Sequence, residues 1–174
     1  KLDSSIISKS QEAMYNFQNT GLSILEIGHR SKEFEKLMNS LQENIRNIFN
    51  VPTNYFTLFL QGGATFQNTF IANNFDKRDK DLGCLVTGTW GKNTFDDFSK
   101  IRETKLRELS QDEIENFVES GEDLKNVDYL HLTSNETING VQLRQFNKIN
   151  HDSLLIDMSS DIGSYRFEWD NVAY

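Results

Sequence analysis

Four short segments of the chain carry residue types that could bind a ligand. The first is the turn Gln61–Thr65, with two consecutive glycines, and the second is Gly88–Gly91, with a tryptophan. The third, Thr133–Thr137, is rich in hydroxyl and amide groups, and the fourth, Asp157–Ser160, begins with a carboxylate. A glycine turn that leads into a helix can hold an anion on its backbone amides. The residue types therefore offer an anion site, an aromatic ring, hydroxyl groups and an acid.

Each segment also has a simpler interpretation. Gly62 and Gly63 could merely permit a tight turn, and a nucleotide P-loop is excluded because no Gly-Lys-Ser/Thr sequence follows them. Trp90 could belong to the core, and Asp157 could cap a helix. Asn135–Thr137 could be turn chemistry. No spacing of histidine and cysteine suggests a metal site.

The surrounding sequence alternates short apolar strands with helices. Strands are predicted at Tyr55–Leu60, Leu82–Thr87, Arg102–Leu109, Val127–Thr133 and Leu154–Asp157. Helices are predicted at Ser5–Phe17, Lys32–Asn50 (with Ser31 as N-cap), Ala64–Asn74, Asn93–Lys100 and Gln111–Ser120, and a charged loop at Asp76–Asp81. This alternation predicts an α/β fold of three α/β/α layers around a mostly parallel sheet, in one domain. All four segments would then meet at the carboxyl ends of the strands, where such sheets bind ligands.

Composition narrows the class of protein. The chain has 174 residues and a net charge of −8, which argues against a nucleic-acid or anionic-membrane surface. No apolar run approaches the roughly 20 residues of a membrane span. The single cysteine, Cys84, excludes an internal disulfide and lies in an apolar run, so burial is a better interpretation than reactivity. We expect a soluble, cytoplasmic protein.

The four segments together describe a site for a flat, phosphorylated ring. The glycine turn would hold a phosphate, Trp90 would stack on the ring, and Asp157 would pair with a protonated ring nitrogen. Pyridoxal 5'-phosphate is the coenzyme whose pyridinium acts as an electron sink beside such an aspartate.

Four motifs make the chain resemble the phosphoserine aminotransferases, a family of class V, fold-type-I pyridoxal-phosphate enzymes. Gly21–Phe34 is similar to the family's G-x-S-x-x-E-x-S-H-R-x-K-E-F, and Leu58–Thr65 to L-F-L-Q-G-G-A-T. Thr133–Gly140 is similar to T-x-N-x-T-I-x-G, and Asp157–Ser160 to D-x-S-S. The resemblance implies the large domain of a homodimeric enzyme that moves an amino group between glutamate and 3-phosphohydroxypyruvate in serine biosynthesis.

The resemblance also implies roles for individual residues. Ala64 and Thr65 would bind the coenzyme phosphate, and Trp90 would stack on the ring. Thr137 would bond the polar edge of the ring, and Asp157 would hold the pyridinium. The substrate would be bound by two further residues, His29 and Arg30, the arginine gripping a carboxylate with bidentate geometry.

The chain departs from the family pattern towards its end. The family's Schiff-base lysine follows a strand that ends like Val172–Tyr174, so we expect that lysine just after Tyr174 and assign no catalytic residue within the chain. The stretch Gly163–Trp169 also differs from the family. We therefore expect residues 1–174 to be a partial domain, inactive alone, that lacks the C-terminal half. One alternative is a degenerate, non-enzymatic relative that acts as a binding partner, and a weaker one is another class V enzyme, such as a desulfurase.

Overall fold

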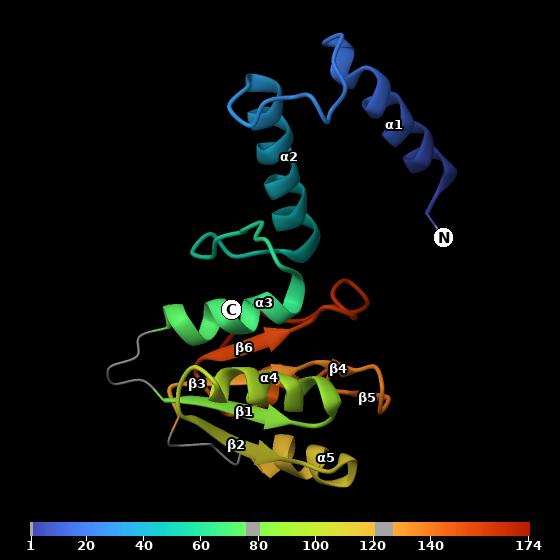
Figure 1. Ribbon diagram of the computed structural model, residues 1–174. Coiled ribbons are helices and arrows are strands. Elements are labelled where there is room, and N and C mark those ends of the chain that lie inside the picture. The colour runs from blue at the N-terminus through green and yellow to red at the C-terminus, as the bar shows by residue number, and fades with distance from the viewer. Residues whose placement is uncertain (1, 76–80, 121–126) are drawn as a thin grey trace. The chain divides into compact units, whose positions relative to one another are not determined.

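The computed structural model describes residues 2–75, 81–120 and 127–174 (Figure 1). Residues 76–80, which make up most of the predicted charged loop, lie outside the described residues. The chain divides into two compact units, Lys1–Thr57 and Leu58–Tyr174. In the described ranges, no helix is long and apolar enough to cross a membrane.

The first unit contains the two helices predicted for this part of the chain. Helix α1 (Ser4–Tyr15) begins at Asp3, whose side chain accepts a hydrogen bond from Ser5 N at 2.8 Å, and a 3-10 turn, η1 (Phe17–Asn19), follows it. Helix α2 (Lys32–Phe49) begins at Ser31, as predicted, and ends at Asn50 in the left-handed conformation. Every residue of α2 is described, and none of them is buried. The helix is thus specified by its caps and its amphipathic pattern more than by a core.

The second unit is built on a parallel sheet, as predicted. Its strands β1 (Leu82–Val86), β2 (Thr104–Glu108), β3 (Tyr129–Thr133) and β6 (Leu154–Asp157) lie in the order β2–β1–β3–β6 among the described residues. Every residue of β1 is buried, which is typical of a central parallel strand. Beyond β6, Val172 forms a parallel bridge with Leu154. The apolar end of the chain thus lies along the sheet.

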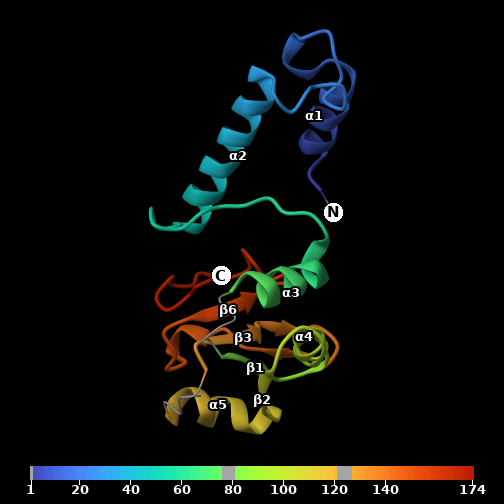
Figure 2. The same ribbon diagram turned by 60° about the vertical axis from the view of Figure 1, so that its left-hand side comes forward.

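Helices cover both faces of this sheet. Helices α3 (Gly63–Asn74) and α4 (Thr89–Ser99) share one core cluster with β1 and β6, while α5 (Gln111–Ser120) and the 3-10 turn η2 (Phe146–Lys148) contribute to a second cluster. Figure 2 shows α4 and α5 on opposite sides of the strands. A small hairpin, β4 (Asn135–Glu136) with β5 (Val141–Gln142), completes the unit. The predicted three-layer α/β/α arrangement is confirmed.

The structure corrects two predictions of local structure. Tyr55–Leu60 forms no strand but an irregular segment, in which Phe56 is 90% exposed. An apolar run becomes a strand only where a neighbour accepts its backbone hydrogen bonds, and no described strand pairs with this one. Helix α4 begins at Thr89 instead of the predicted Asn93, so Trp90 lies in its first turn. Cys84 is buried, as predicted, and burial raises the pKa of its thiol to about 12.

Candidate functional site

The carboxyl ends of the parallel strands border a cavity of about 590 Å³ in the second unit. Side chains from the start of α3, from α4, from the segment after β3 and from the end of β6 line it. All five residues predicted to bind a coenzyme are among them: Ala64, Thr65, Trp90, Thr137 and Asp157. Ala64 and Asp157, which are 93 positions apart in the sequence, thus line the same cavity.

The start of α3 is an open helix N-terminus. Gly62 and Gly63 both adopt positive φ angles, +94° and +61°, which glycine tolerates at little cost. The side-chain amide of Gln67 donates to the carbonyl oxygens of Gln61 (3.1 Å) and Gly63 (3.2 Å), and these bonds fix the turn. No side chain caps the helix, and the neighbouring Ala64 and Thr65 are exposed. The first turn therefore lies at the cavity without a side-chain cap, a suitable arrangement for an anion.

Trp90 stands at the cavity with its indole ring half exposed. The side chain is 43% exposed, so the alternative that Trp90 belongs to the core is wrong. Its Nε1 donates a hydrogen bond to Thr137 Oγ1 at 2.9 Å. Thr137 accepts this bond, so its own hydroxyl hydrogen remains available to a ligand. The pair offers a flat apolar surface beside a hydrogen-bond donor.

Asp157 ends β6 and points its carboxylate into the same cavity. Its Oδ1 accepts hydrogen bonds from the backbone N and the hydroxyl of Ser159, and turns follow instead of a helix, so the helix-cap alternative is wrong. Among the described residues, no side chain or amide donates to Oδ2. This oxygen can therefore accept a hydrogen bond from a ligand.

A buried histidine lies beside Asp157 on the same face of the sheet. His131 pairs with Leu155 in the register of β3 and β6, and the next pair on that face is Thr133 with Asp157. Burial lowers the pKa of His131 to about 4, and the charge of Asp157 opposes this shift. The Phe98 ring contacts the imidazole edge-on at 5.4 Å. The sequence interpretation of His131 as a strand residue is confirmed, and the imidazole is neutral near pH 7.

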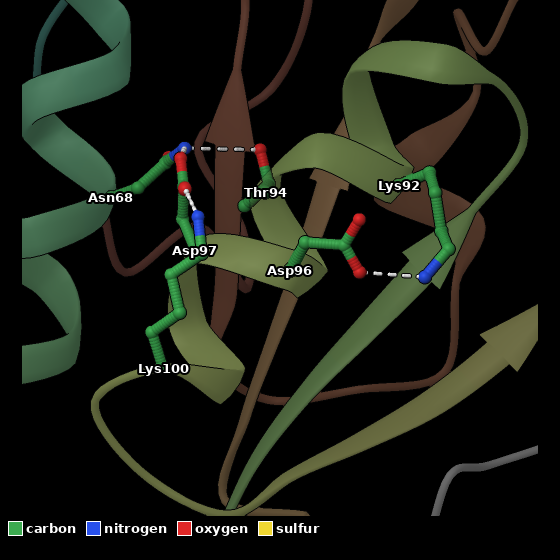
Figure 3. A network of polar contacts seen from close by, with 6 residues as sticks. All are labelled: Asn68, Lys92, Thr94, Asp96, Asp97 and Lys100. Carbon is green, nitrogen blue, oxygen red and sulfur yellow. Dashed lines mark hydrogen bonds and ion pairs between the residues drawn. The ribbon is translucent and has the colours of Figure 1, made fainter.

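Polar contacts between α3 and α4 form another wall of the cavity (Figure 3). Asn68 on α3 donates to Thr94 Oγ1 at 3.4 Å and to Asp97 Oδ2 at 3.2 Å on α4. Lys100 Nζ lies 3.0 Å from the other oxygen of Asp97. The hydrogen bond from Lys100 is the largest cause that lowers the pKa of Asp97. The acid is therefore compensated within the protein and leaves the cavity open to an anionic ligand.

Several of these cavity residues escaped the sequence analysis. Asn68, Asp97 and Lys100 lie in the middle or at the end of helices and carry no motif that marks them. Glu136, which lies between the cavity residues Asn135 and Thr137, was predicted only as the middle residue of a turn, yet its side chain is completely buried. The glycines on either side of Trp90, Gly88 and Gly91, were the sequence signal for a close contact here, because glycines also mark places where other atoms approach the backbone closely.

The predicted substrate residues lie in the other unit. His29 and Arg30 are exposed in the turn between η1 and α2, and their role stays a prediction. Within the described part of the chain, no group of three or more His, Cys, Asp or Glu residues could hold a metal ion.

Comparison with known proteins gives consistent matches. The family model for aminotransferase class-V matches residues 1–173. A phosphoserine aminotransferase from Geobacillus kaustophilus is 38% identical over 167 residues, which cover 94% of this chain and 46% of that protein.

Solved structures agree with the sequence match. A phosphoserine aminotransferase from Bacillus circulans subsp. alkalophilus superposes with a TM-score of 0.85 and 32% identity, over 99% of this chain and 48% of that one. A pyridoxal-phosphate-bound phosphoserine aminotransferase from Trichomonas vaginalis gives a TM-score of 0.83 and 26% identity, over 99% and 52%. The chain therefore spans about half the length of the relatives that it matches.

Proposed function

Because the chain belongs to the class-V aminotransferase family, we propose that it forms the coenzyme-binding part of a pyridoxal-phosphate-dependent aminotransferase. The observation that carries the proposal is the single cavity that gathers Ala64, Thr65, Trp90, Thr137 and Asp157. The proposal does not depend on the relatives' names alone, because the cavity offers a matching group for each polar end of the coenzyme.

The start of α3 binds the coenzyme phosphate in this proposal. The uncapped N-terminus carries a partial positive charge and unpaired N–H groups, which together favour a phosphate. The amides of the first turn and the Thr65 hydroxyl donate hydrogen bonds to the phosphate oxygens. Bonds to a charged acceptor are worth about 1.5–3 kcal/mol each.

Asp157, Trp90 and Thr137 bind the coenzyme ring in this proposal. Asp157 Oδ2 would accept a hydrogen bond from the protonated ring nitrogen and so keep the proton on that nitrogen, while Ser159 fixes the orientation of the carboxylate through Oδ1. The Trp90 indole covers a face of the ring, and Thr137 donates to its polar edge. When bound, the coenzyme supplies an electron sink for bonds at the substrate's α-carbon, and a protonated ring nitrogen strengthens that sink.

The same proposal extends to the substrates and the assembly. The names of the relatives support phosphoserine formation, so we propose glutamate and 3-phosphohydroxypyruvate as the substrates of the complete protein. Arg30 would bind a substrate carboxylate, and His29 would lie near the substrate phosphate. We also propose a homodimer, and we place the Schiff-base lysine beyond Tyr174.

A titration of the complete protein with pyridoxal phosphate tests the proposal. The visible absorbance of the bound coenzyme should be retained after gel filtration, and Asp157→Asn should weaken binding by about tenfold or more, because it loses a charge-assisted hydrogen bond. Asp152→Asn is the matched control, because Asp152 is exposed in the loop before β6 and lies outside the cavity. A parent protein that binds no coenzyme would favour the alternative of a non-enzymatic relative. Equal weakening by both variants would show that the cavity is not the site.

A further inference from the structure

Glu136 occupies an unusual position for a carboxylate. The side chain is 0% exposed, and both of its oxygens accept hydrogen bonds from the backbone at the start of α4. Oε2 lies 2.8 Å from Trp90 N, and Oε1 lies 2.7 Å from Gly91 N. A buried carboxylate is costly unless all of its oxygens are paired in this way. The buried carboxylate is therefore stabilised by the backbone amides of Trp90 and Gly91.

The two glycines next to Trp90 provide the space for this carboxylate. A Cβ added at Gly88 would lie 2.7 Å from Glu136 Cδ, and one added at Gly91 would lie 3.1 Å from Oε1. Neither position requires glycine for its backbone conformation, because Gly88 has an extended φ of 179° and Gly91 lies within the helix. Both glycines are explained by the close approach of Glu136.

Trp90 is consequently held at two points by two successive residues of one segment. Glu136 binds its backbone N, and Thr137 accepts a hydrogen bond from its indole Nε1. Glu136 thus supplies the side-chain cap that the N-cap residue Gly88 does not give α4. Because the carboxylate comes from the residue before Thr137, it also fixes the position of the Trp90 ring relative to Thr137.

We propose that Glu136 is a positioning residue that sets the orientation of the Trp90 ring for the coenzyme. This inference rests on the proposed function for the identity of the ligand. It assigns to Glu136 no contact with the coenzyme itself. Its effect passes through the backbone of Trp90 and Gly91, and the ring retains its open face toward the cavity.

The test compares Glu136→Gln with Glu115→Gln in the complete protein. Glu115 is exposed on α5, so its variant removes the same charge far from the contact. A glutamine offers one acceptor oxygen, and its NH2 group opposes the second backbone N–H. We expect deuterium exchange of the peptide that contains Trp90 and Gly91 to accelerate by about tenfold or more without coenzyme, because a buried N–H loses its partner.

Fluorescence supplies a readout that a loss of stability alone would not change. The chain has two tryptophans, so a Trp169→Phe background isolates Trp90 within it, and any tryptophan elsewhere in the protein is replaced as well. In folded Glu136→Gln, saturating pyridoxal phosphate should quench Trp90 less than in the parent, and the affinity should fall about tenfold. Gly91→Ala, which presses on Oε1 without removing the carboxylate, should give a smaller change of the same sign.

The outcomes separate this inference from the proposed function. If Glu136→Gln and Gly91→Ala leave exchange, quenching and coenzyme affinity at the level of Glu115→Gln, the inference is overturned while the proposed function stands. Faster exchange with unchanged quenching and affinity also overturns it, because Glu136 is then only a helix cap. A parent protein that binds no coenzyme overturns the proposed function and, with it, the role assigned to Trp90.

Discussion

Helices α3 and α4 both have a glycine as N-cap residue and line the same cavity, but their N-termini are capped differently. The start of α3 has no side-chain cap, and its exposed first turn can receive an anion from outside. The start of α4 is closed by the buried carboxylate of Glu136, which is part of the protein. Each helix N-terminus carries roughly half a positive charge. The protein thus neutralises the N-terminus of α4 with its own carboxylate and leaves the N-terminus of α3 without a side-chain cap, in keeping with the phosphate site that we propose there.

The largest effect is expected where the closed helix start is disturbed. In Gly88→Ala, the new Cβ would lie 2.7 Å from Glu136 Cδ, so the carboxylate must move and release the buried N–H of Gly91 and the partly buried N–H of Trp90. Overpacking costs about 1–3 kcal/mol and each unpaired buried group a similar amount, so we expect a loss of about 4 kcal/mol in the free energy of unfolding. Urea denaturation measures it.

Two further variants sharpen this prediction. Thr89→Ala changes an exposed residue of the same helix turn and should cost under about 0.5 kcal/mol. In the double variant Gly88→Ala/Glu136→Ala the clash is relieved, so its cost should be smaller than the sum of the single costs. Additive costs would contradict the close approach.

The open helix start depends on glycine for a different reason. Gly62 has a φ of +94°, and an added Cβ would lie 2.3 Å from Phe66 Cβ, whereas Gly63 has a φ of +61° and open space around it. Left-handed backbone costs a residue with a Cβ about 1–2 kcal/mol, and the clash at Gly62 adds to it. We expect Gly62→Ala to lower the free energy of unfolding by about 3 kcal/mol and Gly63→Ala by about 1 kcal/mol. Equal losses would mean that the turn tolerates the contact with Phe66.

The two helix starts also show what could be predicted from the sequence. The turn at Gly62 and Gly63 was predicted because its signal is local: an apolar run, two glycines and a helical pattern follow one another. The closure of α4 was not, because Glu136 lies 46 residues from Trp90 in the chain. Strands β1, β3 and β6 were predicted from apolar runs, but Tyr55–Leu60 has the same pattern and no described partner strand. Local pattern thus predicts elements, while pairing and long-range contacts require the structure.

The buried His131 on β3 should make the stability of the protein depend on pH. The pKa of His131 is lowered from 6.5 to about 4 by burial, so the unfolded chain binds a proton that the folded protein does not. Stability is therefore complete above pH 6.5 and falls as the pH drops toward 4. At pH 4.5 the loss is roughly 2–3 kcal/mol relative to pH 7.

Denaturation at a series of pH values in His131→Gln checks this expectation. The variant lacks the titrating group, so its stability should fall less than the parent's between pH 6.5 and 4.5. The exposed His29 offers a control, since His29→Gln should keep the parent's pH profile. A His131→Gln profile identical to the parent's would show that other groups cause the acid sensitivity.

The smallest effect is expected in coenzyme affinity, which should differ between variants at the start of α3 and at the start of α4. Thr65 lies in the first turn of α3 and Thr89 in the first turn of α4, and both are exposed. Thr65→Val keeps the β-branched shape but loses a hydroxyl that donates to the phosphate, so the affinity for pyridoxal phosphate should fall about tenfold. Thr89→Val removes the same group at the helix start that Glu136 already closes, and its affinity should match the parent's. Titration of both variants with pyridoxal phosphate at one salt concentration measures the two affinities. An equal loss of affinity in both variants would mean that the phosphate does not distinguish the uncapped start of α3 from the start of α4 that Glu136 caps.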